Sequence, residues 1–496
     1  MRGSWTFITG ASGFVGHYVL AELLRRGVPC VVLVRNQGEK RIAGLLQEIA
    51  PEVPHDAASL RTMQGTLPDD LPEWDGPKIE RVVHVAASTT FRTEGEEPAR
   101  TNVRGTARLL AWMDAHGIAD LTHVSTAYVC GTAPGCAVER IERLPPRFQN
   151  DYEATKWLAE QLVSDWAARG RRRLVVARPS IVTGEHATGR ATEFRGLYVI
   201  ARAVEQLARS YEGRPRADRL SIPLRLRGAA TAPNQIVPVD FVARAIASLA
   251  LNPGASGVFH LTHPQPPSND DIRRMLEAIF DVAGGRFVGD GDIPASSQSR
   301  EEQAFYGGMQ PLAAYFSHSP RFDCSRTVAS LDRSLLPPKI DLPYLRRCVA
   351  YAQARRWGRP RREIDSDVAH FGAAYFERFL PSYLPQSLVS RVRPIRATIR
   401  FIVDQCEWVC RFADGQLHAV QRGCGDSPEQ FGYRTSAAGF WRAISGRVEG
   451  EELFASGEAD VFGDVETALK MSAILREFTR EFPCDRARLE SFVVRA

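Results

Sequence analysis

Cysteine is scarce in this sequence, and long uncharged stretches are missing. Nine cysteines occur among 496 residues, and no two of them form a CxxC pair. A sparse, odd number of this kind is typical of reduced thiols and disfavours a disulfide framework or a zinc site. No run of eighteen uncharged apolar residues occurs, so the sequence predicts no membrane span. The eleven histidines show no metal-ligand spacing, and we expect no metal site.

The sequence also lacks a strong excess of either charge. Its 63 lysines and arginines against 58 acidic residues give a net charge of +5. A charge this small for the length of the chain does not indicate nucleic acid, and we expect no nucleic-acid partner. A strand-like run begins at Trp5, which leaves no room for a signal peptide. Together with the reduced thiols, this favours a cytoplasmic protein.

A length of 496 residues predicts more than one domain, because single hydrophobic cores stop growing well below that size. Through about residue 340, short β-branched runs alternate with helical patterns such as Phe14–Arg25 and Asn102–His116. Strands separated by helices predict an α/β fold, a Rossmann-type doubly wound parallel sheet. The clearest strand candidates are Thr6–Thr9, Val31–Val34, Val82–Val85, Thr122–Ser125 and Leu174–Ala177.

The pattern changes after Leu336-Pro337-Pro338, and a helical stretch follows around Leu345–Arg356. Residues 355–400 contain ten arginines and four acidic residues, with aromatic side chains between them. One interpretation is a solvated linker with a helix that packs on the next domain. The other is a basic amphipathic surface that contacts anionic lipid or an acidic carrier protein, a peripheral membrane contact in the first case.

The last hundred residues return to strand patterns at Ala397–Val403 and Cys406–Phe412, and Asp414-Gly415 predicts a hairpin turn before Gln416–Gln421. Three helical segments follow. They are expected at Ala437–Ser445, Glu449–Phe454 and Val465–Glu477. The sequence therefore predicts three parts: a nucleotide-binding domain at 1–340, a basic helical linker at 341–385, and a separate α+β domain at 386–496.

A glycine-rich stretch, TGASGFVG at residues 9–16, follows the first strand and opens the first helix. Its glycines permit a tight turn and let backbone N–H groups approach a pyrophosphate, and the helix N-terminus adds the positive end of its dipole. This context predicts a dinucleotide site. The residues expected to contact the cofactor there are Gly10, Ser12, Gly13, Phe14, Val15 and Gly16.

The second strand ends at Arg35, where folds that select a ribose 2′-hydroxyl usually carry an acidic residue. An arginine suits a 2′-phosphate through charge-assisted hydrogen bonds. Arg41 follows six residues later and could complete the same pocket. The pair favours NADPH over NADH. The alternative is that Arg35 is a solvated strand end.

Tyr152 and Lys156 stand at positions i and i+4, so they share one face of a helix. A nearby ammonium stabilises phenolate, and we expect it to lower the pKa of Tyr152 so that the phenol acts as an acid or base beside a carbonyl. Val124-Ser125-Thr126 ends a strand and can supply a hydroxyl to the same substrate oxygen. Together with the glycine-rich loop, this predicts a dehydrogenase site.

In these features the chain, from residue 4 to about 335, resembles the extended short-chain dehydrogenase/reductase family. The matching stretches are TGASGFVG at 9–16, HVAA at 84–87, NVRGT at 102–106, STAY at 125–128, the Tyr152xxxLys156 pair and RPSIV at 178–182. The resemblance implies Thr126, five residues before Gly131, as the catalytic hydroxyl, Tyr152 as proton donor, and Lys156 as its ribose-binding partner. It implies a water- or helix-positioning role for Asn102. It adds Ala86, Ala87, Pro179 and Ile181 to the cofactor contacts.

Within that family, STAYV, RPSIVTG and the arginine after the second strand look most like thioester reductases and fatty acyl-CoA reductases. One departure is Gly65-Thr66-Leu67, where many relatives have Gly-Asp-Leu against the adenine. The Arg-rich segment from Gly189 to Ala230 is expected to shape a small substrate subdomain.

Residues from about 386 resemble the sterol-carrier-protein-2-like fold, whose sheet and helices enclose an apolar tunnel. The matching stretches are WVCR at 408–411, FWRAISG at 440–446, FASG at 454–457 and VFGD at 461–464. The resemblance implies a lipophilic ligand, although a filled core would give the same pattern.

These features predict an NADPH-dependent reductase of a lipophilic acyl thioester, on CoA or an acyl-carrier protein, that yields an aldehyde or alcohol. A second hypothesis is an extended dehydrogenase or epimerase that acts on a sterol-like hydroxyl or a sugar nucleotide. A third is a non-catalytic NADP(H)-sensing lipid-binding protein, which the intact Thr126, Tyr152 and Lys156 set disfavours.

Overall fold

The structure is a computed structural model of the whole chain. The chain divides into two compact units. It describes residues 4–35, 38–53, 56, 58–91, 96–132, 135–144, 146–209, 211, 220–289, 291, 293–307, 315, 320–358, 371–392, 396–404, 406–414, 416–423, 431–456 and 458–492. The first unit comprises residues 1–197, 228–275 and 314–354, and the second comprises 198–227, 276–313 and 355–496. No helix among the described residues is long and apolar enough to cross a membrane.

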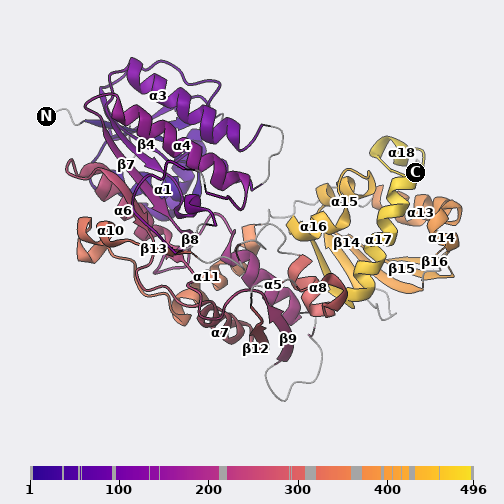
Figure 1. Ribbon diagram of the computed structural model, residues 1–496. Coiled ribbons are helices and arrows are strands. Elements are labelled where there is room, and N and C mark those ends of the chain that lie inside the picture. Colours follow the sequence, from indigo (N-terminus) through magenta and orange to yellow (C-terminus); the bar gives the residue numbers. More distant parts are fainter. Residues whose placement is uncertain are drawn as a thin grey trace. The chain divides into compact units, whose positions relative to one another are not determined.

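The first unit is built on a seven-stranded sheet with the order β11-β7-β5-β4-β1-β2-β3 (Figure 1). All of its strand pairs are parallel. The strands are β1 Trp5–Thr9, β2 Cys30–Val34, β3 Leu60–Gln64, β4 Ile79–His84, β5 Asp120–Val124, β7 Arg173–Pro179 and β11 Gly257–Leu261. This arrangement confirms the predicted doubly wound parallel sheet.

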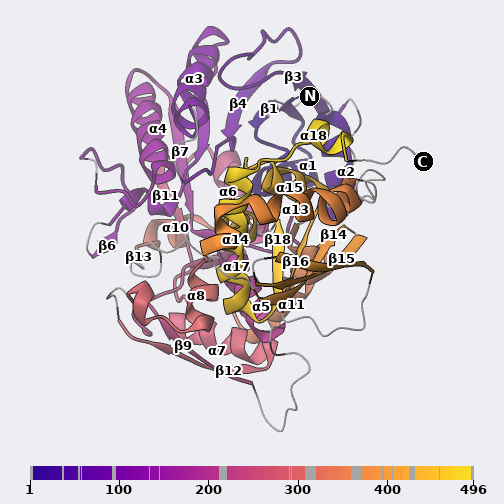
Figure 2. The ribbon, with the colours of Figure 1, turned by 90° about the vertical axis from the view of Figure 1, so that its right-hand side faces the viewer.

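Both faces of this sheet are buried, because successive strand residues point to opposite sides. In β1, Phe7 packs in one apolar core with Trp112 and Trp166, and Ile8 packs in the other with Leu20 and Phe241. Helices α3 and α4 therefore cover one face, and α1, α2 and α6 cover the other (Figure 2). Their bounds are α1 Phe14–Arg25, α2 Gly38–Ile49, α3 Gly105–Ala115, α4 Asp151–Ala168 and α6 Val239–Leu251.

Further short elements complete the first unit. Two small parallel pairs join β8 to β10 and β6 to β13. The elements are β6 Cys136–Ala137, β8 Ile181–Thr183, β10 Ile236–Pro238, β13 Arg321–Phe322, α7 Asn269–Phe280, α10 Ser325–Ser330 and α11 Leu342–Ala354. α7 begins here and ends in the second unit. α11 is held by Tyr344, whose hydroxyl donates to the Gly184 carbonyl at 2.8 Å.

The second unit combines part of the predicted substrate subdomain with the C-terminal part of the chain. Strands β9 and β12 pair in parallel, and Gln206 of helix α5 donates to Asp460 at 3.1 Å. The elements before residue 355 are α5 Leu197–Arg209, β9 Leu220–Leu226, β12 Val282–Phe287 and α8 Arg300–Gly307. α5 begins at the last residue of the first unit.

A five-stranded mixed sheet with the order β16-β15-β14-β17-β18 forms the C-terminal part. The strands are β14 Ala397–Val403, β15 Cys406–Ala413, β16 Gln416–Arg422, β17 Phe431–Thr435 and β18 Ala459–Gly463. The helices are α15 Ala437–Ile444, α16 Gly450–Ser456, α17 Val465–Glu481 and α18 Arg486–Glu490. Ala413 pairs with Gln416 across the predicted hairpin, and Asp414 has the left-handed φ of 52° that such a turn favours. Gly415 and Gly457 lie outside the described residues.

The stretch predicted as a basic linker, residues 341–385, is divided between the two units after Ala354. Its later part packs into the C-terminal apolar core, where the Phe376 ring stacks on Trp408 with centroids 4.9 Å apart. That part is the π-helical turn Ala374–Phe379 and helix α13 Leu380–Tyr383, followed by α14 Leu388–Val392. Residues 359–370 and 393–395 of the Arg-rich stretch lie outside the described residues. Its interpretation as a lipid-contacting surface stays a prediction.

Candidate active site

The ends of four parallel strands meet at one edge of the large sheet. Thr9 pairs in register with His84, and Val124 of the next strand pairs with Ala177 of β7. The loops that follow these residues carry the predicted site residues. In open parallel sheets, ligands bind outside the carboxyl ends of the strands. The candidate site therefore lies at this edge.

The glycine-rich loop is a tight turn between β1 and α1. Gly10 has φ of 74°, and a Cβ on it would lie 2.5 Å from the Ala86 backbone nitrogen. The Gly13 N–H donates to the Gly10 carbonyl at 3.0 Å, and a Cβ on Gly16 would overlap that same carbonyl. A side chain at these positions would thus break the loop.

The loop also leaves the start of α1 open to a ligand. Gly13 is the N-cap of α1, and no side chain hydrogen-bonds to the cap. The first intrahelical bond runs from the His17 N–H to the Gly13 carbonyl at 3.1 Å. The N–H groups of Phe14, Val15 and Gly16 therefore face the position of a pyrophosphate without competition from a capping side chain. Ser12 is half-buried in the same turn. These residues fit a dinucleotide.

The two arginines predicted to select the cofactor lie near this loop. Arg35 follows β2 directly, and Arg41 lies in the first turns of α2. Both side chains are exposed, and neither forms an ion pair with a carboxylate among the described residues. The structure records no contact between the two arginines. They are accordingly two cations available on the nucleotide side of the sheet.

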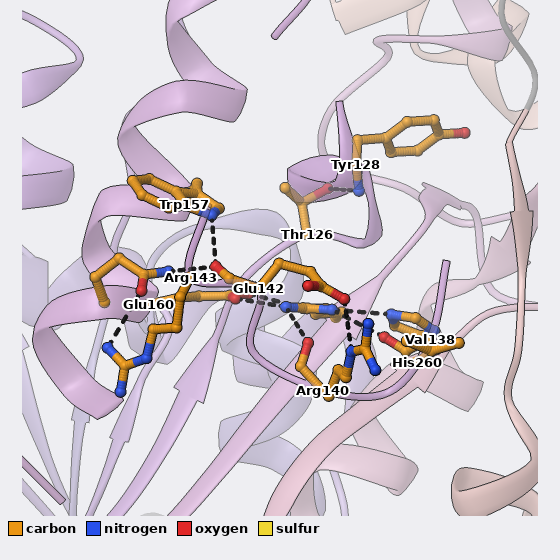
Figure 3. Close-up of polar contacts among 11 residues, drawn as sticks. Thr126, Tyr128, Val138, Arg140, Glu142, Arg143, Trp157, Glu160 and His260 are labelled. Carbon is orange, nitrogen blue, oxygen red and sulfur yellow. Dashed lines mark hydrogen bonds and ion pairs between the residues drawn. The ribbon is translucent and has the colours of Figure 1, made fainter. Parts of the chain in front are cut away.

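Thr126 and Lys156 are held at the end of β5. The Thr126 side chain accepts a hydrogen bond from the Tyr128 N–H at 3.3 Å (Figure 3). Lys156 is buried in α4, and its ammonium donates to the Val124 carbonyl at 2.8 Å. Burial lowers the pKa of Lys156 to about 8. The nearby Glu160 carboxylate has the opposite, smaller effect on this pKa.

Tyr152 is placed beside Thr126 at the start of the same helix. Asn150 caps this helix, because its side-chain oxygen accepts from the Glu153 N–H at 3.0 Å. Burial raises the pKa of Tyr152 to about 12, while a hydrogen bond with Thr126 lowers it. The expected lowering of the Tyr152 pKa toward neutrality by Lys156 is therefore not what the structure gives. Desolvation is the largest cause of the rise, and the Lys156 ammonium is directed to the strand carbonyl.

Asn102 is fully buried in a π-helical turn, Arg100–Arg104, that precedes α3. Its side chain accepts from the Ser88 N–H at 2.8 Å and donates to the Ser88 carbonyl at 2.9 Å. It also donates to Thr155 at 3.0 Å, and Thr155 donates to the Tyr152 carbonyl at 3.0 Å. These contacts join the loop after β4 to the helix of Tyr152.

The remaining predicted cofactor contacts lie on the same sheet edge. Ala86 and Ala87 follow β4 and are half-buried, and the Ala86 N–H donates to the Thr9 hydroxyl at 3.3 Å. Pro179 ends β7 and is buried, and Ile181 begins β8 and is half-buried. Ala86 and Ala87 thus lie beyond the carboxyl end of β4, and Pro179 and Ile181 lie at or just beyond that of β7.

A buried ion pair supports α4 below these residues. Arg178 of β7 donates to both carboxylate oxygens of Glu160, at 2.9 Å and 2.6 Å. The two side chains are 3% and 0% exposed. Arg178 also lies 3.2 Å from His260 and donates to the Arg140 carbonyl at 3.1 Å. The pair fixes α4 against β7, one helical turn beyond Lys156.

A second tyrosine, Tyr315, comes from a distant part of the chain and lies at the start of the Tyr152 helix. The sequence did not indicate this contact. The Tyr315 hydroxyl donates to Glu153 at 2.7 Å and accepts from Asn150 at 2.7 Å. Its ring lies edge-on to Tyr128, with centroids 5.3 Å apart. Arg195 lies close enough to lower the pKa of Tyr152 and donates to Thr89. A lone tyrosine in a segment without clear periodicity carries no sequence signal for such a contact.

Comparisons with known proteins match two parts of the chain to two families. Residues 8–246 match the family described as Male sterility protein, and residues 376–476 match the SCP-2 sterol transfer family. A GDP-6-deoxy-D-mannose reductase of Pseudomonas aeruginosa is 28% identical over 281 residues, which span 56% of this chain and 79% of that protein. Two other curated relatives are matched over smaller shares of their own lengths, 28% and 50%.

Two solved structures share the fold. One is the terminal R domain from the myxalamid PKS-NRPS biosynthetic pathway, with a TM-score of 0.58 and 22% identity over 71% of this chain and 91% of that one. The other is a thiolation-reductase di-domain from an archaeal non-ribosomal peptide synthetase, with a TM-score of 0.55 and 19% identity over 72% of this chain and 76% of that one. The chain therefore carries an NAD(P)-binding oxidoreductase domain of the extended short-chain dehydrogenase/reductase type, followed by a C-terminal SCP2 domain.

Proposed function

We propose that this protein is an NADPH-dependent reductase of a lipophilic acyl thioester, carried on CoA or on a carrier protein. The observation that carries the proposal is the placement of Tyr152, Thr126 and Lys156 at the sheet edge that also holds the glycine-rich loop. The likeness to a terminal R domain and to a thiolation-reductase di-domain supports a thioester as the substrate.

The bound cofactor would supply a hydride to the thioester carbonyl carbon. Thr126 and Tyr152 hydrogen-bond the carbonyl oxygen as negative charge develops on it, and Tyr152 transfers its phenolic proton to that oxygen. The resulting hemithioacetal breaks its C–S bond and releases an aldehyde and a thiol. A second reduction of the aldehyde, with a second cofactor, gives the alcohol. Lys156 supplies a buried positive charge one turn along the helix from Tyr152, and Asn102 keeps the helix of Tyr152 in place.

The selection of NADPH over NADH is part of this proposal. Arg35 and Arg41 present two exposed cations beside the glycine-rich loop, and a 2′-phosphate is the part of NADPH that NADH lacks. The fit of the first N–H groups of α1 to a pyrophosphate is independent of this choice, since both cofactors carry one.

The C-terminal SCP2 domain would hold the lipophilic acyl chain of the substrate or product. Its core is rich in aromatic rings, including Phe376, Trp408 and Phe440. In the second unit, Gln206 of α5 contacts Asp460 of β18, so a helix of the substrate subdomain touches this domain directly.

A sugar nucleotide or sterol-like hydroxyl is the second candidate substrate. The GDP-6-deoxy-D-mannose reductase match favours it, since this relative is aligned over 79% of its own length. The same Tyr152 and Lys156 pair would then oxidise or reduce a carbon–oxygen bond outside any thioester.

The test follows NADPH absorbance with the purified full chain and acyl-CoA substrates of increasing chain length, pantetheine thioesters, GDP- and UDP-sugars, and hydroxysteroids. We expect turnover of the thioesters with release of free thiol, and none in the Tyr152→Phe variant. Turnover of a sugar nucleotide or steroid without thioester reduction would contradict the proposal. Mass spectrometry of lipid that co-purifies with the chain tests the ligand of the C-terminal domain.

A further inference from the structure

His84 is the last residue of β4 and lies fully buried between the glycine-rich loop and helix α3. Its Nδ1 is 2.7 Å from the Thr9 hydroxyl, and its Nε2 is 3.1 Å from the Thr106 hydroxyl. Thr9 ends β1 immediately before Gly10, and Thr106 lies in the first turn of α3. The two ring nitrogens therefore connect two different elements of the candidate site.

The neighbouring bonds fix which atom donates at each step. The Thr106 hydroxyl donates its single proton to the Asn102 carbonyl at 2.7 Å, so it must accept from an Nε2–H of His84. A neutral imidazole that is protonated on Nε2 accepts on Nδ1, and the Thr9 hydroxyl donates to it. The Thr9 oxygen in turn accepts from the Ala86 N–H at 3.3 Å. Every hydroxyl proton in this chain of bonds is then used.

The surroundings hold His84 in this neutral form. Burial, together with the Lys156 ammonium, lowers the pKa of His84 to about 3. The ring beside it is His123, with centroids 5.2 Å apart, and burial holds the pKa of His123 well below its ordinary value. At neutral pH His84 is therefore uncharged, a donor on one side and an acceptor on the other.

Beyond Thr106, the bonds continue to the candidate proton donor. Asn102 accepts from the Ser88 N–H and donates to Thr155, and Thr155 donates to the Tyr152 carbonyl. Hydrogen bonds therefore connect the residue before Gly10 with the backbone of Tyr152, and the path passes from the backbone of Asn102 to its side chain. It spans the distance between the cofactor-binding loop and the start of helix α4.

We propose that His84 is a positioning residue that sets the glycine-rich loop and the Tyr152 helix relative to each other. Its Nδ1 holds the loop through Thr9, and its Nε2–H holds the start of α3 through Thr106, from which Asn102 and Thr155 reach the Tyr152 helix. The proposal rests on the roles proposed above for that loop and for Tyr152. The geometry assigns a separate function to each nitrogen. Loss of the Nδ1 bond affects cofactor binding, and loss of the Nε2–H bond affects the chemical step.

The test uses two substitutions, each of which keeps the hydrogen-bonding group of one ring nitrogen and loses that of the other. His84→Asn keeps an acceptor near the position of Nδ1 and loses the donor toward Thr106. His84→Gln keeps a donor near Nε2 and loses the acceptor toward Thr9. We expect the Asn variant to lower kcat about fivefold with an NADPH dissociation constant near that of the wild type, and the Gln variant to weaken NADPH by about the same factor with a smaller loss in kcat.

The matched control makes the same substitution at the adjacent ring, so that His84→Leu is compared with His123→Leu. The nitrogens of His123 have no hydrogen-bond partner among the described residues, so leucine there removes no such bond. We expect His84→Leu to show both defects, and His123→Leu to change thermal stability alone. Thr106→Val, which nearly conserves volume, repeats the loss of the helix side if a His84 variant fails to fold.

A direct measurement does not depend on turnover. The ¹⁵N chemical shifts of the His84 ring report its tautomer, and we expect Nε2–H. An Nδ1–H tautomer, or equal changes of kcat and NADPH affinity in the Asn, Gln and His123→Leu variants, would overturn the proposal. If the wild type reduces no thioester, the proposed function fails, while the tautomer and the NADPH affinities still decide the role of His84.

Discussion

The Lys156 ammonium donates to the carbonyl of Val124 at 2.8 Å, two residues before Thr126 in the chain. One bond thus joins the helix that carries Tyr152 to the strand that leads to the second candidate hydroxyl. Lys156 is 2% exposed, so this cation sits in a site with almost no water. Its charge is therefore costly to the folded chain as well as useful to the chemistry.

Lys156 should make stability depend on pH in the alkaline range. Burial lowers its pKa from 10.5 to about 8, so between these values the unfolded chain binds more protons than the folded chain. The stability of the wild type should then rise, relative to Lys156→Met, as pH increases from about 8 to 10.5. Urea unfolding of both proteins across that window measures the difference.

The control for this prediction is Lys78→Met, at a lysine whose side chain is 85% exposed. Its stability curve should run parallel to that of the wild type. A constant difference between the wild type and Lys156→Met over the whole window would show that Lys156 titrates as in water.

Tyr152→Phe should remove turnover while it leaves cofactor binding intact. Because burial holds the Tyr152 pKa near 12, the phenol stays protonated at neutral pH and is ready to donate in the reductive direction. Loss of a positioned proton donor lowers kcat by roughly 10²–10⁴-fold. Thr126→Val should have a smaller effect, since Tyr152 retains its proton. Steady-state kinetics with NADPH titrations measure both, and substantial activity of Tyr152→Phe would rule out this donor.

Arg35→Gln should weaken NADPH and leave NADH nearly unchanged. A charge-assisted hydrogen bond contributes about 1.5–3 kcal/mol, which corresponds to roughly 10- to 150-fold in affinity. The matched control is Arg108→Gln, an exposed arginine on α3, across the sheet from α1 and α2. Binding titrations with both cofactors measure the ratio. An equal loss for NADH would place Arg35 away from the 2′-phosphate.

The sequence was sufficient for the parts of the fold that rest on periodicity and local turns. The run Val31–Val34 predicted β2, and the glycine spacing predicted the loop whose Gly10 has a positive φ. These signals work because strand alternation and glycine torsions are local. The five strands expected for the large sheet all formed, and β3 and β11 join them at its edges.

Contacts between distant residues could not be predicted in this way. Nothing in the sequence joins Tyr315 to Glu153, which are 162 residues apart, or Thr9 to His84. The pKa of Tyr152 was also out of reach, because it depends on how completely the folded chain excludes water from the phenol. The motif spacing identifies Tyr152 as the candidate proton donor, and its burial in the folded chain determines its pKa.

Removing one partner of the buried Arg178–Glu160 pair should cost more unfolding free energy than replacing both partners. Glu160→Gln leaves the guanidinium without its charge partner, and loss of one member of a buried pair costs about 3–5 kcal/mol of unfolding free energy. The double variant Glu160→Leu with Arg178→Met should recover part of this loss, because no lone buried charge remains. Recovery should be incomplete, since Arg178 also donates to the Arg140 carbonyl, which would lose that partner. Denaturant unfolding of the single and double variants gives the coupling free energy. Additive losses would show that the two charges are stabilised independently. Because the Glu160 carboxylate raises the pKa of Lys156, the lower limit of the Lys156 window should move to lower pH in the Glu160→Gln variant.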